Sequence, residues 1–430
     1  MSRMRFGAFL APHHPVGENF THLLQRDLAL GVHLDQLGLD EFWCGEHHST
    51  GWEVIGSPEI FLAALAERTS RIKLGTGVVS LPYHHPFMVA QRLVQLDHQS
   101  HGRLIFGSGP GALPSDAAML GLDPMRQRAM QDEALGVIIR LLAGETVTHH
   151  SDWFTLEAAE LQVLGHQERI PMTVASSISP SGMKLAGKYG IGALSIASNS
   201  SEGLLALPTQ WSFAEEAAAE HGQTVSRDDW RVLTAFHLAD SADQARAEAV
   251  DGLQRWNNEY NVRVLGRPDA HHTEDKWELL DAATTNGAAG AGAVIVGRPD
   301  DMITAIESLR ELTGGFGTMI GFVHDWVSPE ANHRSWELFA RYVVPHFQGG
   351  TAALRRSAER VEANKAELMA GAGAAIFAQI QADDRASAAF AVTIANAAAQ
   401  AGAGSSAAAG AAMSAHRDAA EASEPSQSDS

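Results

Sequence analysis

Short apolar runs rich in β-branched residues alternate with longer amphipathic segments through most of this chain. Such alternation is typical of a parallel sheet whose strands are joined by helices. Strands are predicted at 5–11, 41–44, 72–81, 103–106, 172–175, 193–196, 232–238 and 318–323, and helices at 21–37, 86–99, 124–142, 179–190 and 299–312. Ser57 and Pro58 form the start of a further helix. Eight strand–helix repeats predict an α/β fold of the (β/α)8 TIM-barrel type with insertions.

Two features bear on that prediction. A ninth apolar run, Ala293 to Val296, precedes a turn and a helix, and we interpret it as a short extension rather than a barrel strand. A doubly wound sheet is the alternative architecture. It usually carries a phosphate-binding fingerprint near the N-terminus, and this chain has none there. The barrel is therefore the preferred prediction.

The composition changes after about residue 349. Residues 1–348 are predicted to form the barrel, and residues 349–430 an alanine-rich C-terminal helix and low-complexity tail. The segment from Thr351 to Met369 has charges at helical spacing. Beyond about Ala370 the Ala/Gly/Ser tracts offer little surface to bury, so we expect disorder or a lone helix there.

The overall composition excludes several classes of function. The net charge of −20 argues against a nucleic-acid partner and an anionic membrane. No run of about 18 apolar residues is present, and the N-terminus lacks the apolar segment of a signal peptide. The single cysteine, Cys44, excludes an internal disulfide and a cysteine-based zinc cage. A cytoplasmic protein is expected.

Ionisable residues gather where the predicted strands end. Glu46-His47-His48 follows the second strand, and His13-His14 and His84-His85 follow the first and third, so in a barrel all three would meet at the C-terminal mouth. Adjacent residues of an extended chain point to opposite faces, which argues against paired metal ligation, and no metal is expected. Acid–base or hydrogen-bonding use of one ring per pair is preferred, because imidazole titrates near neutrality. Packing of the rings in loops is the alternative, and the pairs at 149–150 and 271–272 are expected on the surface.

Three further segments are candidate ligand contacts. Gly107-Ser108-Gly109-Pro110-Gly111 follows a strand but fails the dinucleotide fingerprint, so its glycines indicate only close approach by a flat ligand. Gly75-Thr76-Gly77 places two glycines in a strand, which marks a bulge or close ligand approach. The serines of 176–183 lie beside a helix N-terminus and would suit a phosphate, although a serine-rich helix cap explains them as well.

Taken together, these segments resemble the bacterial-luciferase-like family of flavin-dependent monooxygenases. The resemblance runs in the expected order from about Arg5 to Phe347. Its matching features are Glu46-His47-His48, Gly75 to Pro82 with the following His-Pro, Gly102 to Gly107, Ser176 to Gly190, and Ser335 to Phe347. Within the family, Gly109 to Asp116 is most similar to the limonene-type monooxygenases of actinobacteria.

The resemblance implies that reduced flavin is bound at the C-terminal mouth of the barrel. His47 matches the catalytic histidine of the family, as the proton donor or stabiliser for the oxidising species, with Glu46 or His48 holding it. The flavin ring would lie over Gly77-Val78, where the family has a bulge with a non-prolyl cis peptide. The phosphate would lie at the serines near the amides of Gly182 and Met183. The full set of expected cofactor contacts is Gly77, Val78, Gly109, Pro110, Gly111, Ser176, Ser177, Ser179, Ser181, Gly182 and Met183.

Two departures from the family pattern limit what is implied. This chain has Gly109 and Pro110 where true luciferases carry a reactive cysteine and a phosphate-binding arginine. It has Ile196 where they carry an indole. Light emission from a long-chain aldehyde is therefore not expected.

The resemblance implies a monooxygenase that uses reduced FMN or FAD and O2 to epoxidise a small apolar substrate, such as a monoterpene like limonene. Phe9, Trp43, Trp52, Ile196 and Phe322 are expected to form the apolar wall. Since no NAD(P)H fingerprint is present, NAD(P)H would act indirectly through a separate NAD(P)H:flavin reductase, and a homodimer is implied. Three alternatives stay open: an F420-dependent oxidoreductase of the same fold, a non-catalytic flavin-binding protein, and a metallohydrolase.

Overall fold

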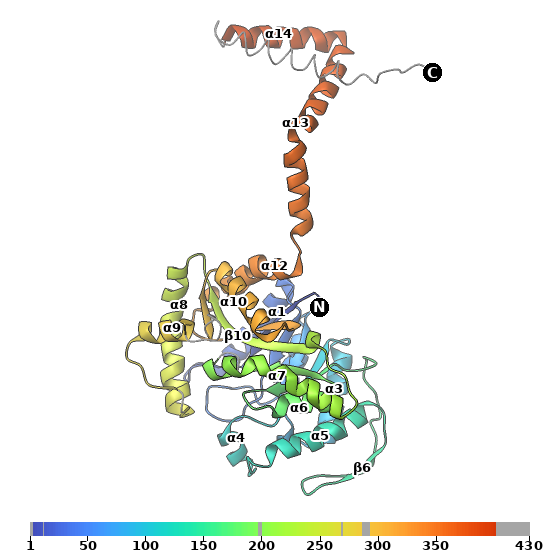
Figure 1. Cartoon of the computed structure of the whole chain (residues 1–430), viewed down its shortest axis with the longest axis vertical. Helices are drawn as coiled ribbons and strands as arrows, with labels where there is room; N and C mark the ends of the chain where they lie inside the picture. Colours follow the sequence, from blue (N-terminus) through green and yellow to red (C-terminus); the bar gives the residue numbers. More distant parts are fainter. Residues whose placement is uncertain (1–2, 12, 197–199, 268–269, 286–292, 401–430) are drawn as a thin grey trace. The chain divides into compact units, whose positions relative to one another are not determined.

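The computed structural model describes residues 3–11, 13–196, 200–267, 270–285 and 293–400. Contacts within the chain divide it into two compact units, Met1–Gln348 and Gly349–Ser430 (Figure 1). Among the described residues, no helix is both long enough and apolar enough to cross a membrane.

The first unit is a closed parallel barrel, as the alternating pattern predicts. Its eight strands are β1 (Arg5–Leu10), β2 (Glu41–Cys44), β3 (Lys73–Thr76), β5 (Leu104–Gly109), β8 (Met172–Ser176), β9 (Gly192–Ser195), β10 (Trp230–Leu238) and β12 (Thr318–Val323). Each pairs in parallel with the next, and β12 pairs with β1 to close the ring. Closure excludes the doubly wound alternative.

Two details differ from, or refine, the expected strands. The run predicted as one strand from Ile72 to Leu81 is broken into β3 and β4 (Val79–Ser80), and the peptide between Gly77 and Val78, which lies between these two strands, is cis. The ninth run forms β11 (Val294–Gly297), which among the described residues pairs only with β10, in parallel, and stands outside the ring. The interpretation of that run as an extension is confirmed.

Helices follow the strands and pack against the outside of the barrel (Figure 1). They are α1 (Phe20–Leu37), α2 (Pro58–Ala66), α3 (Pro86–Gln99), α5 (Gln127–Leu142), α6 (Ser181–Tyr189), α7 (Ser201–Glu220), α8 (Ala242–Arg255), α10 (Pro299–Thr313) and α11 (Pro329–Leu338). Local signals explain their ends: the Asn19 side chain accepts from the His22 amide at the start of α1, and Gly190 ends α6 with a φ of 62°.

Insertions lie between these repeats. They are α4 (Pro114–Met119), the antiparallel pair β6 (Val147–His150) and β7 (Thr155–Ala159), the π-helical segment η3 (Trp256–Val264), α9 (Lys276–Thr285), the short helical turns η1 (Leu81–Tyr83), η2 (Arg227–Asp229) and η5 (Phe339–Val343), and α12 (Val344–Gln348). The helix predicted from residue 124 begins only at Gln127, and Pro114 opens a separate short helix before it. Likewise α6 begins at Ser181 rather than 179, because Pro180 occupies its N-cap.

An ion pair occupies the interior of the barrel. The Arg231 guanidinium donates to both carboxylate oxygens of Glu41, at 2.7 and 3.0 Å, and both residues are almost fully buried. The Trp43 indole also donates to Glu41, at 3.0 Å. Its ring lies so close to Gly75 that a Cβ there would come within 2.4 Å of it. Gly75 is therefore needed for packing of the barrel interior.

Arg231→Leu is expected to lower the free energy of unfolding by about 3–5 kcal/mol, because it leaves the Glu41 carboxylate buried without its bidentate partner. Denaturant unfolding measures the change. The double variant Glu41→Leu/Arg231→Leu removes both charges and should recover much of the loss. A single variant as stable as the unsubstituted protein would contradict this account of the barrel interior.

In its described part, residues 349–400, the second unit contains the helices α13 (Ala352–Gln381) and α14 (Asp384–Gln400). They contact each other through the rings of Phe377 and Phe390, whose centroids are 6.0 Å apart. The expectation of disorder or a lone helix beyond Ala370 is wrong for residues 370–400, because alanine is the strongest helix former and carries both helices. The low-complexity tract from residue 401 onward lies outside the described residues.

Candidate active site

A cavity of about 710 Å³ opens where the barrel strands end at their C-termini. Most of the residues predicted as site residues line it: Glu46, His47, Gly77, Val78, Pro110, Gly111, Ser176, Ser177, Ser179, Ser181 and Gly182. His48, Gly109 and Met183 do not line it. Gly109 lies behind Val78, and the Met183 side chain is fully buried in the core.

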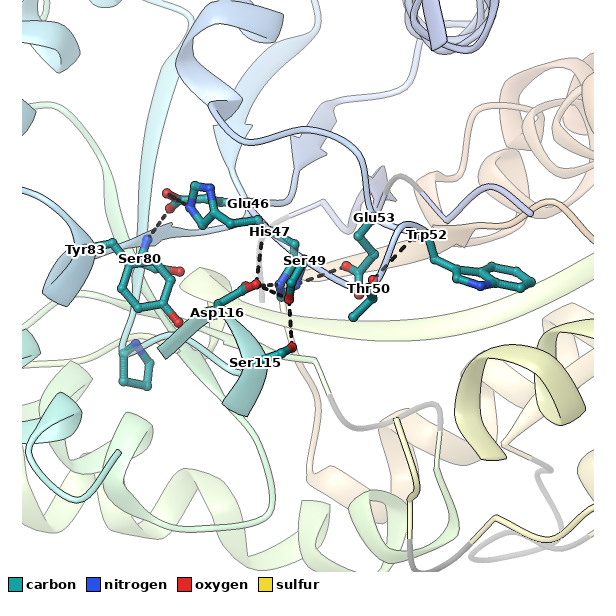
Figure 2. A network of polar contacts seen from close by, with 12 residues as sticks. Glu46, His47, Ser49, Thr50, Trp52, Glu53, Ser80, Tyr83, Ser115 and Asp116 are labelled. Atoms are coloured by element: carbon teal, nitrogen blue, oxygen red, sulfur yellow. Dashed lines mark hydrogen bonds and ion pairs between the residues drawn. The ribbon is translucent and has the colours of Figure 1, made fainter. Parts of the chain in front are cut away.

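His47 is held between two carboxylates that the sequence analysis did not single out. Its Nε2 lies 3.0 Å from Glu53 Oε2, and its Nδ1 lies 3.2 Å from Asp116 Oδ2 (Figure 2). Glu53 belongs to the same loop after β2, whereas Asp116 comes from α4. The expectation that Glu46 or His48 holds His47 is therefore wrong, because both ring nitrogens face other partners.

Both carboxylates are anchored by further donors. Glu53 accepts from the Tyr260 hydroxyl of η3 and lies 3.3 Å from His13 Nε2. Asp116 accepts from the Ser49 hydroxyl and, at 3.2 Å, from the His48 amide. Glu53 and Asp116 are nearly buried, and the His47 side chain is 18% exposed. The geometry fixes the His47 ring from both sides.

These neighbours control the charge of His47. Burial alone would lower the pKa of His47, but the Glu53 and Asp116 carboxylates raise it to about 10. The pKa values of Glu53 and Asp116 are correspondingly lowered against the opposing effect of burial, chiefly by His13 and His47 for Glu53 and by His47 and Ser49 for Asp116. His47 is therefore an imidazolium at neutral pH, with one N–H directed to each carboxylate.

Glu46 forms a second, separate network. Its Oε1 lies 3.0 Å from His48 Nε2 and 2.5 Å from His84 Nε2, and its Oε2 accepts from the Ser80 amide at 2.6 Å (Figure 2). Burial opposes ionisation of Glu46, yet these donors lower its pKa, and the hydrogen bond that Glu46 accepts from His48 raises the pKa of His48. Glu46 thus fixes the loop after β2 to the turn at β4.

The two histidines of each adjacent pair point in different directions, as the alternation of side chains along an extended chain predicts. His13 contacts Glu53, whereas His14 contacts Asp27 and Asp325, at 2.9 and 3.2 Å. His47 lines the cavity and His48 turns toward Glu46. Within the described residues, no group of three or more His, Cys, Asp or Glu side chains is arranged to hold a metal ion.

The serine segment after β8 forms a polar end of the cavity. Ser177, Ser179, Ser181 and Gly182 line it beside the N-terminus of α6, and Ser179 and Ser181 share a hydrogen bond of 2.9 Å. A Cβ at Gly182 would come within 2.3 Å of the Ala175 carbonyl, so only glycine allows this turn to close. The Ser176 hydroxyl is directed to Gln210 instead, at 3.1 Å.

Two side chains of α5, missed in the sequence analysis, complete this end. Arg128 lines the cavity and donates to Ser181 Oγ at 3.3 Å. Gln131 also lines it, and its Nε2 is buried without a hydrogen-bond partner in the described part of the chain. A cation, a free amide donor, three hydroxyls and a helix N-terminus fit an anionic phosphate.

The remaining walls are largely apolar. Of the residues expected there, Phe9, Ile196 and Phe322 line the cavity, together with Leu113, Leu233 and Trp256. Trp43 and Trp52 do not line it. Trp43 lies over Gly75 inside the barrel, and Trp52 packs against Tyr260 with ring centroids 5.3 Å apart.

Comparisons with known proteins agree with this arrangement. The luciferase-like monooxygenase family matches residues 4–315. A 4-hydroxyprotoasukamycin monooxygenase from Streptomyces nodosus subsp. asukaensis is 48% identical, over 85% of this chain and 99% of that protein. A limonene 1,2-monooxygenase from Rhodococcus erythropolis is 49% identical, over 81% of this chain and 87% of that protein.

A solved structure is similar as well. It is the oxygenating constituent of the 3,6-diketocamphane monooxygenase from Pseudomonas putida, described as a type II Baeyer–Villiger monooxygenase in complex with FMN. It has a TM-score of 0.68 and 25% identity, over 80% of this chain and 98% of that one.

Proposed function

This chain belongs to the luciferase-like monooxygenase family, and we propose that it uses reduced flavin and O2 to oxygenate a small, largely apolar substrate. One observation carries the proposal: a single cavity joins a phosphate-type cradle at Ser177–Gly182 to a fixed imidazolium, His47, across apolar walls. Such a cavity has the parts that a bound flavin and a substrate beside it require.

FMN is the flavin that we propose. Ser177, Ser179, Ser181, the Gly182 and Met183 amides, Arg128 and Gln131 would hold its phosphate, and the Gly77–Val78 peptide, Pro110 and Gly111 would face its ring. FMN is also the ligand named for the similar diketocamphane enzyme. We propose that NAD(P)H acts through a separate reductase, because the chain has no dinucleotide fingerprint of its own, and that the chain works as a homodimer, as its family resemblance implies.

The chain's own part in the reaction lies in His47 and its partners. Reduced flavin would supply the activation of O2. His47 holds a proton at Nε2 that is directed to Glu53, and Glu53 in turn contacts Tyr260 and His13 at the cavity wall. The fixed positive charge would stabilise negative charge that develops beside it, at little cost in reorganisation. Phe9, Ile196 and Phe322 would keep water away from that charge.

The apolar side chains that line the cavity indicate the class of substrate. Phe9, Leu233, Trp256 and Phe322 would suit a compact hydrocarbon skeleton such as a monoterpene, and limonene is the named substrate of one relative. The second relative is named for a different substrate, 4-hydroxyprotoasukamycin. We therefore propose limonene-like epoxidation as the first activity to assay rather than as the natural reaction.

The proposal is tested by oxygen uptake with reduced FMN and reduced FAD across a panel of monoterpenes, with product and H2O2 both measured. Substrate-dependent product with little H2O2 is expected for at least one compound with FMN. Titration with F420 on the same preparation separates the alternative cofactor. Tight F420 binding with no oxygen consumption from reduced flavin would overturn the proposal in favour of that alternative, and flavin binding without any oxygen consumption would favour a non-catalytic protein.

Arg128→Ala should weaken FMN binding about tenfold, since a charge-assisted hydrogen bond to an exposed phosphate is worth about 1.4 kcal/mol. Fluorescence titration measures it, and riboflavin, which lacks the phosphate, should bind both proteins equally. Arg126→Ala is the matched control, because Arg126 pairs with Asp152 and does not line the cavity. An equal loss for riboflavin would show that Arg128 does not act on the phosphate.

A further inference from the structure

The helix α13 exposes an apolar stripe that the described residues of its unit, 349–400, leave uncovered. Leu354, Val361 and Leu368 recur every seven residues and are 71%, 51% and 54% exposed. None of the residues of α13 is buried. Phe377, which packs on α14, lies nine residues after Leu368, and at about 100° per residue this places it on the opposite face. The contact with α14 therefore does not cover the stripe.

The sequence of the stripe is complementary to itself when reversed. In an antiparallel alignment with Val361 against its own copy, Leu354 lies level with Leu368 of the second copy, and the apolar layers match. The same alignment sets Arg355 level with Glu367 of the second copy, and Arg360 level with Glu362 of the second copy. A parallel alignment would instead bring each of these charges level with its own like charge.

We propose that α13 is a self-association element that pairs with α13 of a second copy of this chain in antiparallel orientation. A heptad-spaced apolar seam flanked by opposite charges is the arrangement by which two helices select each other and their orientation. The element belongs to the unit Gly349–Ser430 and not to the barrel unit Met1–Gln348, so it adds an assembly function rather than a part of the barrel's chemistry. The proposal does not depend on the proposed reaction.

The full chain tests this by sedimentation velocity and light scattering. Val361→Glu/Leu368→Glu should lower the mean mass at a given protein concentration across a dilution series, because losing the α13 contact weakens association even where the barrels also contact each other. Ala363→Glu/Ala366→Glu is the matched control, because both positions are exposed and face away from the stripe, and it should keep the original mass. Circular dichroism verifies that both variants remain helical. Equal masses for all three helical proteins would overturn the proposal.

Charge exchange tests the orientation. Arg355→Glu/Arg360→Glu sets like charges level with Glu367 and Glu362 of the second copy and should weaken association at least severalfold, more at low salt. Adding Glu362→Arg and Glu367→Arg to the same chain reverses every pair and should restore it. Failure of the fourfold variant to recover the mass would overturn antiparallel pairing.

Discussion

His47→Ala should uncouple oxygen consumption from product formation. Product per O2 is expected to fall by about 10²-fold or more, and H2O2 should appear in its place, since a positioned acid–base group typically contributes that much. The structural reason is that His47 is the protonated side chain fixed beside the cavity by two carboxylates. Parallel assays of O2, H2O2 and product measure the ratio.

The control for this variant is His85→Ala. His85 also follows a barrel strand, but its ring packs on Phe154, with centroids 5.9 Å apart, and it does not line the cavity. It should leave coupling intact. FMN affinity of the His47 variant should stay within a few fold of the unsubstituted value, because His47 is not part of the phosphate cradle. If O2 consumption and product formation stay coupled in the His47→Ala variant, His47 takes no part in the reaction.

Glu53→Gln should move the alkaline limit of activity to lower pH. The folded pKa of His47 is raised to about 10 from its ordinary value of 6.5, and the Glu53 charge is the largest cause that raises it. In the unsubstituted protein His47 thus stays charged through neutral pH and loses its proton only near pH 10. Without the Glu53 charge, Asp116 alone retains the proton, so the activity that depends on the imidazolium declines earlier. A pH–rate profile of product formation measures the shift.

The same pKa shift predicts how stability depends on pH. Because the folded pKa of His47 lies above the unfolded one, its contribution is complete below pH 6.5 and is lost as pH rises through 10. Denaturant unfolding between pH 7 and 10 should show a smaller loss for Glu53→Gln than for the unsubstituted protein. An alkaline limb at the same pH in both proteins would mean that Glu53 does not hold the His47 charge.

The barrel was predictable because strand and helix periods are local properties of the sequence. Even the exclusion of Ala293 to Val296 from the ring is confirmed, since β11 pairs with β10 and with no other strand that the structure describes. The alanine-rich C-terminal helix was predictable and is confirmed by α13. A second helix, α14, packs on it where disorder or a lone helix was expected, because alanine favours a helix even in a segment of low complexity.

The sequence predicted those residues of the candidate site that directly follow a strand or that match a motif of the luciferase-like family. Glu46, His47 and Ser177–Gly182 follow strands, and strand ends meet in a barrel. Asp116 reaches His47 from α4, far along the chain, and no local pattern indicates that contact. Glu53 lies six residues after His47 in the same loop, and Arg128 and Gln131 share one face of a helix. The short separation between His47 and Glu53, and the helical spacing of Arg128 and Gln131, are local features of the sequence from which these contacts could have been predicted.

We propose that this chain inserts one atom of O2 into an apolar substrate by means of reduced flavin. Reaction of the protein with reduced FMN, limonene and ¹⁸O2, followed by mass spectrometry of the product, tests it most directly. We predict a product that carries a single ¹⁸O atom and forms only in the presence of the protein. O2 consumed entirely as H2O2 across the whole panel of monoterpene and oxygenated substrates, or a product whose oxygen comes from water, would contradict the account.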